Sequence, residues 1–316
     1  SRFSYDGLIN QRLDVAYIRR HNRLVSCSID EAISAAAAQV KKTDPDKISA
    51  LVGDLVDLET TFAFKQLFDK CGVVNIDCRV EGEKFDPTNR FTYLFNTTVA
   101  GIDKSDACLI IGANIRKDSP VLNARIRAKY HHGNYPIAAI GNKGDLTYKY
   151  SDLGSDLAVL DEILAGKSFG KVLAEAKNPL IIVGMDAAKR EDGDAIIAKA
   201  MEIAQKYNAA RADFCGFNVL NRAAARVGAM EVGFLPGRYG KDFRSIVSSV
   251  NDGSMKMLFL LGVDNLNIEK NSDTIIVYIG HHGDRGAEVA DIIIPGSAYT
   301  EKDGIYVNLE GSPQFA

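Results

Sequence analysis

Short apolar runs alternate with longer mixed stretches over most of this chain. The runs predict strands that are buried on both faces. They lie at 49–54, 73–78, 106–111, 136–141, 179–184, 257–262, 274–279 and 291–294. In the stretches between them apolar residues recur every three or four positions, which is typical of amphipathic helices. The expected helices lie at 57–70, 120–130, 157–165, 168–176, 193–207, 217–231 and 242–250. This alternation predicts right-handed βαβ units, and hence an α/β fold with parallel sheets.

The beginning of the chain does not follow this alternation. Residues 1–25 are polar and irregular, which predicts an arm or a short hairpin, and Ser28 and Glu31 then have the spacing of a capping box before a first helix. We therefore expect an N-terminal arm and helix over residues 1–48. Two α/β lobes should follow. The predicted boundaries are 49–80 plus 178–311 for the first lobe, 81–177 for an inserted second lobe, and 312–316 for a short tail.

Two of the predicted strands end in the same way. DACLIIGAN at 106–114 and MLFLLGVDN at 257–265 each finish with Gly, a small residue, and Asn or Asp. Glycine allows a sharp turn at the carboxyl end of a strand, which is the edge where open α/β sheets bind ligands. The layout is therefore that of a ligand-binding α/β protein.

Composition narrows the classes of partner. The 316 residues are 46% hydrophobic with a net charge of −3, so the chain has enough material for two α/β domains and lacks the basic excess of most nucleic-acid-binding proteins. No run of about 18 apolar residues occurs, so we expect no membrane insertion. The five cysteines form no C-x-x-C pair, which indicates a reducing compartment and argues against an iron–sulfur cluster held by these residues.

Two loops carry candidate chemistry. GANIRKDSP at 112–120 leads from a glycine turn into a helix N-terminus, where Arg116, Arg125 and Arg127 could help to bind an anion. The alternative is an ordinary strand–turn–helix connection with solvated arginines. In IGHHGDRGA at 279–287, His281, His282 and Asp284 suggest a metal. However, adjacent histidines on an extended backbone should point to opposite faces and chelate one ion poorly, so a polar loop or a single catalytic histidine is favoured.

Several longer segments resemble a known family. ADIIIPGSAYTEKDGIYVNLEG at 290–311 is similar to the end of the sheet domain in molybdopterin oxidoreductases, and LIIGAN and LLGVDN resemble their two dinucleotide-binding loops. Further segments resemble one branch, the large iron–sulfur subunits of respiratory complex I. These are SRFSYDGLINQRL (1–13), LVGDLVDLET (51–60), FNTTVAGIDKSD (95–106), NARIR (123–127), DLTYKYSDLG (145–154) and GHHGDRGA (280–287).

The resemblance implies a fold, a parent complex and a location. The fold would be two parallel-sheet α/β/α lobes of the formate dehydrogenase-like type, one inserted in the other. The parent NADH–quinone oxidoreductase would pass electrons through iron–sulfur clusters to quinone, coupled to proton translocation. This chain would be a segment that follows the cluster-binding N-terminal domains. It would lie among other hydrophilic-arm subunits, peripheral to the cytoplasmic face of the bacterial inner membrane or to the matrix side in mitochondria.

One departure from the family decides the functional hypothesis. Active molybdenum enzymes place a Cys, selenocysteine or Ser ligand after the second strand, where this chain reads CRVEGEKFDPTNRF at 78–91. Cys78 lies too early, at the strand end, so we expect no molybdenum, no metal ligands and no catalytic residues here. The favoured hypothesis is a structural, non-catalytic lobe. A vestigial pocket would lie near Gly112, Asn114, Gly262, Asp264 and His282.

Two alternatives remain open. In the first, the chain is an active or ligand-binding relative that holds a nucleotide or pterin with the same loops. In the second, it is a free-standing α/β binding module without a role in respiration.

Overall fold

The computed structural model describes residues 7–141, 144–269 and 273–316. The chain divides into two compact units. Unit 1 contains residues 1–81, 223–308 and 313–316, and unit 2 contains residues 82–222 and 309–312. Within the described ranges, none of the helices has both the length and the apolar character needed to cross a bilayer.

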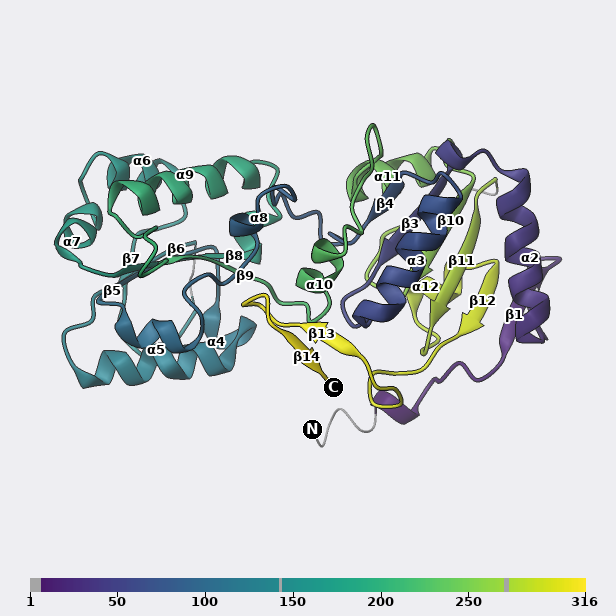
Figure 1. The fold of residues 1–316 in the computed structure, drawn as a ribbon, viewed down its shortest axis with the longest axis horizontal. Helices are drawn as coiled ribbons and strands as arrows, with labels where there is room; N and C mark the ends of the chain where they lie inside the picture. The colour runs from purple at the N-terminus through teal and green to yellow at the C-terminus, as the bar shows by residue number, and fades with distance from the viewer. Residues whose placement is uncertain (1–6, 142–143, 270–272) are drawn as a thin grey trace. The chain divides into compact units, whose positions relative to one another are not determined.

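Unit 1 is built on a seven-stranded sheet with the order β2-β1-β12-β11-β10-β3-β4 (Figure 1). Its parallel strands are β3 (Ile48–Val52), β4 (Asn75–Asp77), β10 (Met257–Leu261), β11 (Ile275–Gly280) and β12 (Ile292–Pro295). Its helices are α2 (Ile29–Lys42), η1 (Pro45–Lys47), α3 (Leu58–Lys70), α10 (Arg226–Glu231), α11 (Phe243–Asn251) and α12 (Arg285–Val289). All five side chains of β3 and of β10 are buried, as their unbroken apolar sequences predict.

An antiparallel hairpin extends this sheet beyond β12. Strands β1 (Ala16–Arg20) and β2 (Arg23–Cys27) pair with each other, and β1 also pairs antiparallel with β12. The two-residue turn uses His21 and Asn22 at φ 50° and 62°, which is the left-handed backbone that a tight hairpin needs. The predicted hairpin is therefore confirmed.

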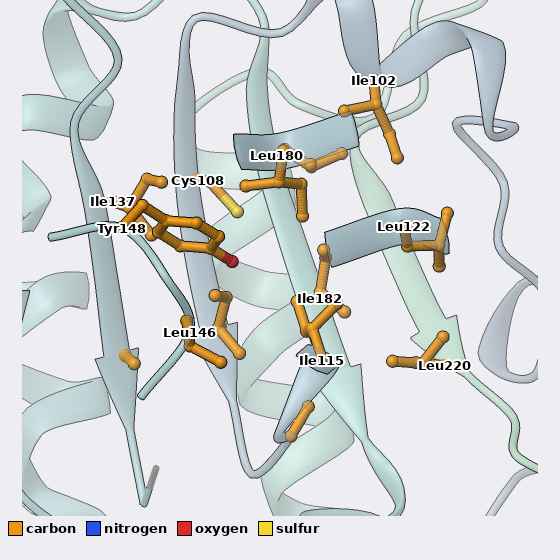
Figure 2. Close-up of a cluster of buried hydrophobic side chains, with 14 of the residues drawn as sticks. Ile102, Cys108, Ile115, Leu122, Ile137, Leu146, Tyr148, Leu180, Ile182 and Leu220 are labelled. Carbon is orange, nitrogen blue, oxygen red and sulfur yellow. The ribbon is translucent and has the colours of Figure 1, made fainter. Parts of the chain in front are cut away.

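Unit 2 is a five-stranded parallel sheet with the order β7-β6-β5-β8-β9. The strands are β5 (Ala107–Ile111), β6 (Ile137–Ile140), β7 (Ser151–Asp152), β8 (Pro179–Gly184) and β9 (Phe217–Leu220). The helices are η2 (Arg90–Thr92), η3 (Ala100–Lys104), α4 (Ile115–Asp118), α5 (Pro120–His132), α6 (Ala158–Leu164), α7 (Gly170–Glu175), α8 (Met185–Ala188) and α9 (Gly193–Lys206). Figure 2 shows a buried cluster in this unit, in which Ile115 and Leu122 pack on strand residues such as Leu180 and Ile182.

The predicted lobe boundaries need correction. The sequence pattern assigns residues 178–222 to the first lobe, but β8 pairs with β5 and β9 pairs with β8, so both strands belong to the sheet of unit 2. The predicted N-terminal arm and helix, as far as residues 7–48 are described, is not a separate part, because β1 hydrogen-bonds to β12; residues 1–6 of that prediction lie outside the described residues. The tail is not free either, because β14 (Pro313–Phe315) pairs with β13 (Ile305–Val307). The predicted helix over 217–231 is a strand followed by the short helix α10.

Candidate functional site

The sheet of unit 1 has a topological switch point between β3 and β10. From β3 the chain continues to β4 on one side, whereas β10, β11 and β12 are added in turn on the other side. Loops that leave the carboxyl ends of strands diverge at such a point and leave a crevice for a ligand. A cavity of about 610 Å³ lies here, and the glycines that end these strands, Gly53, Gly262, Gly280 and Gly296, line it.

The close approach of two turns explains why two of these residues are glycines. A Cβ atom on Gly53 would lie 1.8 Å from the carbonyl oxygen of Gly262, so no side chain fits between the turns. Gly262 itself has φ +59°, a conformation that glycine adopts without strain. The predicted strand-end turn at 262 is thus a structural requirement of the cavity floor.

Asp264 is the acidic residue in the cavity wall with the most unusual environment. Its Oδ2 accepts a hydrogen bond of 3.1 Å from the hydroxyl of Tyr278. Its Oδ1 is buried and has no hydrogen-bond partner among the described residues. Burial raises the pKa of this carboxyl, and the nearby carboxylate of Asp284 adds to the effect. Asp264 is therefore a partly buried carboxyl of the cavity wall, with its Oδ2 engaged by Tyr278 and its Oδ1 shielded from solvent.

The two histidines do not point to opposite faces, contrary to the sequence-based expectation. The rings of His281 and His282 lie edge to face, with centroids 4.6 Å apart and an interplanar angle of 65°. Burial lowers the pKa of His281, while Nε2 of His282 lies 2.6 Å from the carbonyl oxygen of Gly7. In the ranges that the structure describes, no cluster of three or more His, Cys, Asp or Glu side chains has the geometry of a metal site.

The segment after β12 contributes ion pairs that the sequence analysis missed. Glu301 accepts two hydrogen bonds from Arg12, of 2.8 and 2.5 Å, and one from the backbone N–H of Ala298. The hydrogen bonding with Arg12, followed by the bond from Ala298, lowers the pKa of the Glu301 carboxyl to about 2. Lys302 lies 2.5 Å from the carboxylate of Asp57, the N-cap of α3. The sequence signals these ion pairs only through the run of charged residues at 301–303. The partners, Arg12 and Asp57, lie more than 240 positions away in the chain.

The second strand-end turn, at Gly112, belongs to unit 2 and, unlike the turn at Gly262, packs against a helix. A Cβ atom on Gly112 would lie 2.5 Å from the Cβ of Ala187, so this turn packs against α8. The side chain of Asn114 caps α4 by accepting from the backbone N–H of Lys117, and the backbone N–H of Asn114 donates to the carboxylate of Asp118. Gly112 and Asn114 are therefore engaged in local packing and capping.

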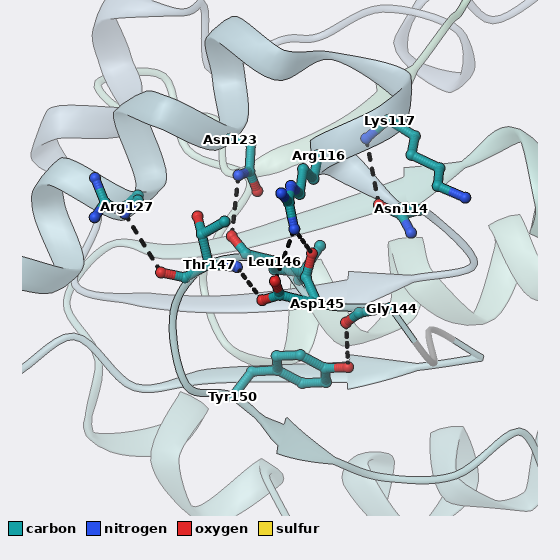
Figure 3. A network of polar contacts seen from close by, with 10 residues as sticks. All are labelled: Asn114, Arg116, Lys117, Asn123, Arg127, Gly144, Asp145, Leu146, Thr147 and Tyr150. Atoms are coloured by element: carbon teal, nitrogen blue, oxygen red, sulfur yellow. Dashed lines mark hydrogen bonds and ion pairs between the residues drawn. The ribbon is translucent and has the colours of Figure 1, made fainter.

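The arginines near this turn also have intramolecular partners. Figure 3 shows Arg116 directed at Asp145 and Arg127 directed at the carbonyl oxygen of Thr147. The guanidinium of Arg116 lies 2.7 Å from the carboxylate of Asp145. Arg125 pairs with Asp103 at 3.0 Å. These contacts favour the structural interpretation of 112–120 over an anion site. Of the five predicted pocket residues, Gly262, Asp264 and His282 line the cavity of unit 1, whereas the other two lie in unit 2.

Comparison with known proteins decides the family. The family model described as molybdopterin oxidoreductase matches residues 12–316. The chain belongs to the molybdopterin oxidoreductase family. Its fold is also similar to two solved structures at a TM-score of 0.65. One is the formyltransferase/hydrolase complex of Methylorubrum extorquens, at 15% identity over 95% of this chain and 92% of that one. The other is acetylene hydratase of Pelobacter acetylenicus, at 12% identity over 96% and 57%. The predicted fold class is confirmed.

Curated relatives are more similar in sequence. A subunit of the NADH-quinone oxidoreductase of Rickettsia felis is 44% identical over the whole chain, and its counterpart in Rickettsia bellii is 46% identical. The chain spans about half the length of these relatives, 46% and 45% respectively.

The family implies a molybdenum–pterin cofactor, and the environment of Cys78 tests whether a metal ligand is present. The thiol lies directly after β4 and is 1% exposed, and burial raises its pKa to about 12. A thiol enclosed in the core cannot reach a metal in the cavity of unit 1, and Cys78 is not among the residues that line it. Residues 79–91 contain no cysteine or serine. The residues present therefore do not fit a molybdenum centre held in the family's usual way.

Proposed function

We propose that this chain is a structural, non-catalytic lobe of the large iron–sulfur subunit of NADH–quinone oxidoreductase. In this proposal the whole complex transfers electrons from NADH through iron–sulfur clusters to quinone and couples this transfer to proton translocation. The clusters would be bound by a part of the subunit that precedes this chain in the longer protein. The lobe would hold that part in place beside its neighbours.

One observation carries the proposal. The similarity to the NADH-quinone oxidoreductase subunits of five Rickettsia species extends over the entire chain at 40–46% identity, so it includes both units and their connections. The inaccessible thiol of Cys78 supports the non-catalytic part, because the position closest to the family's metal ligand is occupied by a core side chain.

A scaffold has a physical role in such a complex. Electron transfer between clusters depends steeply on distance, so domains that carry clusters need fixed positions. The buried parallel sheets supply rigidity, since every residue of β3, β5 and β10 is buried. The proposed partners are the other hydrophilic-arm subunits of the complex. The proposed location is peripheral, on the cytoplasmic face of the bacterial inner membrane or on the matrix side in mitochondria.

The test uses the longer protein in bacteria that lack their own copy of the large iron–sulfur subunit. Complex assembly is measured by native electrophoresis, and NADH:quinone turnover is expressed per assembled complex. Gly53→Val, which disrupts the packing of unit 1, should lower the amount of complex. Asp264→Asn, which removes a charge from the cavity wall and keeps an acceptor for Tyr278, should leave turnover per complex unchanged. A fall in turnover with Asp264→Asn at normal assembly would contradict the non-catalytic role.

Metal analysis provides an independent readout. The purified complex should contain iron in the amount expected for its clusters, and molybdenum far below one atom per complex. Stoichiometric molybdenum, or a pterin released on denaturation, would overturn the proposal.

A second candidate is favoured by the cavity of unit 1, which lies at the carboxyl ends of the strands, where open α/β sheets bind ligands, and whose wall includes Asp264. In this case the chain still binds a nucleotide or a pterin. A ligand that binds only the native state raises the melting temperature in a saturable way. Thermal-shift titration with GMP, AMP and a free pterin would show such a shift, and Asp264→Asn should abolish it. No shift at millimolar concentrations would rule this candidate out.

A further inference from the structure

The loop between α10 and α11 presents a tyrosine to solvent. Figure 1 shows this loop as a narrow projection of unit 1 beside α11. Tyr239 in this loop is 88% exposed, which is the highest value among the large hydrophobic residues that the structure describes. A single exposed hydrophobic residue is common on protein surfaces. Tyr239 differs from such residues in the conformation of its backbone.

Tyr239 occupies a turn position that normally carries glycine. The N–H of Gly240 donates to the carbonyl oxygen of Gly237 at 2.8 Å, which closes a β-turn around the two residues between them. Arg238 does not have a positive φ whereas Tyr239 has φ 65°, so the turn is of type II. Glycine or asparagine is preferred at the third position of this turn, because a larger side chain makes the left-handed backbone strained. The folded chain therefore carries a strain here that glycine would remove.

The turn is fixed to the chain just before the edge strand β4. The N–H of Gly237 donates to the carbonyl oxygen of Val74 at 2.9 Å. A Cβ atom on Gly240 would lie 2.2 Å from the same carbonyl oxygen, so the backbone of the turn lies directly on this residue. The loop therefore holds the backbone of Tyr239 in a defined position. A side chain on a backbone that is ordered before binding loses less entropy when a partner immobilises it.

Arg238 adds a charge beside the exposed ring. Its guanidinium carbon lies 5.0 Å from the centre of the Tyr239 ring, within the range of a cation–π contact. Arg238 is exposed, and within the described ranges its guanidinium has no hydrogen bond or ion pair. Its N–H groups can therefore donate to a carboxylate of another molecule. Tyrosine and arginine are also among the residue types that are enriched at the hot spots of protein interfaces.

We propose that Arg238 and Tyr239 anchor unit 1 to another protein subunit of the complex. The partner surface has a pocket for the phenol ring and a carboxylate at the rim of that pocket for the guanidinium. This inference rests on the function proposed above, which places the chain in a multi-subunit assembly. A membrane surface fits less well, because attraction to anionic lipids uses clusters of about four to eight basic side chains and this turn carries one.

The test separates docking from folding. The longer protein is expressed at graded levels in bacteria that lack their own copy of the large iron–sulfur subunit, and assembled complex is measured by native electrophoresis. The melting temperature of each purified longer protein is measured separately. Tyr239→Gly removes the ring and relieves the backbone strain, whereas Tyr239→Phe keeps the ring. The matched control is Ser168→Gly, because Ser168 is another exposed residue with a positive φ, of 49°, and lies in unit 2.

Tyr239→Gly should raise the expression level needed for half-maximal assembly about tenfold or more, as the loss of a hot-spot side chain does. Tyr239→Phe and Ser168→Gly should assemble like the original protein, and Arg238→Glu should assemble less well than Arg238→Gln. Tm of both glycine variants should stay within about 2 °C of the original, because the relief of strain offsets the greater freedom of the unfolded chain. Normal assembly of Tyr239→Gly would refute the anchor, and so would a fall in its Tm beyond this limit, because the role would then be structural.

Photo-cross-linking identifies the partner. With p-benzoylphenylalanine at position 239, illumination of the assembled complex should link this position to one other subunit, in a peptide that contains Asp or Glu. Cross-links only to lipid, or only within the same polypeptide, would contradict a protein pocket as the partner. Failure of the unaltered longer protein to join the complex would contradict the proposed function itself. Normal joining by both the unaltered protein and Tyr239→Gly would contradict this inference alone.

Discussion

Replacing Gly53 by alanine should destabilise unit 1, because two backbone turns meet at this position. The added Cβ would lie 1.8 Å from the carbonyl oxygen of Gly262. Real Cβ atoms essentially never approach another heavy atom closer than 3.0 Å, so the two turns must move apart by 1.2 Å. The obstacle is backbone, so no side-chain rotation relieves the clash. The N–H of Gly53 also donates to the carbonyl oxygen of Leu261 at 2.9 Å, and this bond must stretch when the turns separate.

The magnitude follows from these two losses. Overpacking costs about 1–3 kcal/mol, and a weakened buried hydrogen bond costs about 0.5–1.5 kcal/mol. The expected destabilisation is therefore about 3 kcal/mol. For a domain of about 150–250 residues each kcal/mol lowers Tm by about 2–4 °C, so Tm of unit 1 should fall by about 6–12 °C.

Differential scanning calorimetry of the purified chain measures this effect. The matched control is Gly7→Ala, where an added Cβ meets nothing within 4 Å. The control should stay within about 0.5 kcal/mol of the original protein. If Gly53→Ala melts within 2 °C of the control, the two turns are not in contact as described, and the account of the cavity floor is wrong.

Three further predictions concern the core, a helix cap and the thiols. Leu260→Ala should cost about 2–5 kcal/mol in the free energy of unfolding, measured with urea, because the side chain is fully buried. A loss below 1 kcal/mol would mean that β10 is not central. Burial raises the pKa of Asp57, but the hydrogen bonds from Lys302 and Thr60 and the charge of Lys302 together outweigh it, and the net pKa is lowered. The stabilisation by Asp57 should therefore be present above pH about 4 and be lost below it. The stability difference from Asp57→Asn, measured by urea unfolding at several pH values, should shrink between pH 5 and 3, and a constant difference would refute the ion pair. Burial raises the pKa of Cys78 and of Cys108 to about 12, so mass spectrometry should find both unmodified by iodoacetamide at pH 8 in the native protein. Rapid alkylation of Cys78 would show that the thiol is accessible.

The fold could be predicted wherever the spacing of hydrophobic residues was compatible with only one type of secondary structure. The strands predicted at 106–111 and 257–262 are β5 and β10. The spacing of Ser28 and Glu31 marks the start of α2, where the N–H of Glu31 donates to the Ser28 hydroxyl. Prediction failed at residues 217–220. A four-residue apolar segment followed by mixed residues is compatible with strand or helix, and pairing with β8 decided for a strand.

Sequence alone determined the family, the alternation of strands and helices, and the two glycine turns at strand ends, because these depend on local spacing and on motifs that are contiguous in the chain. Only the tertiary structure decided what each turn does. Gly112 packs against Ala187, whereas Gly262 faces Gly53 at the floor of a cavity that is also lined by Asp264, Gly7 and Leu8. The physical reason is that the role of a turn depends on which segment, distant in the sequence, packs against it. That segment is α8 in one unit and the end of β3 in the other, and no local pattern in the sequence specifies the choice.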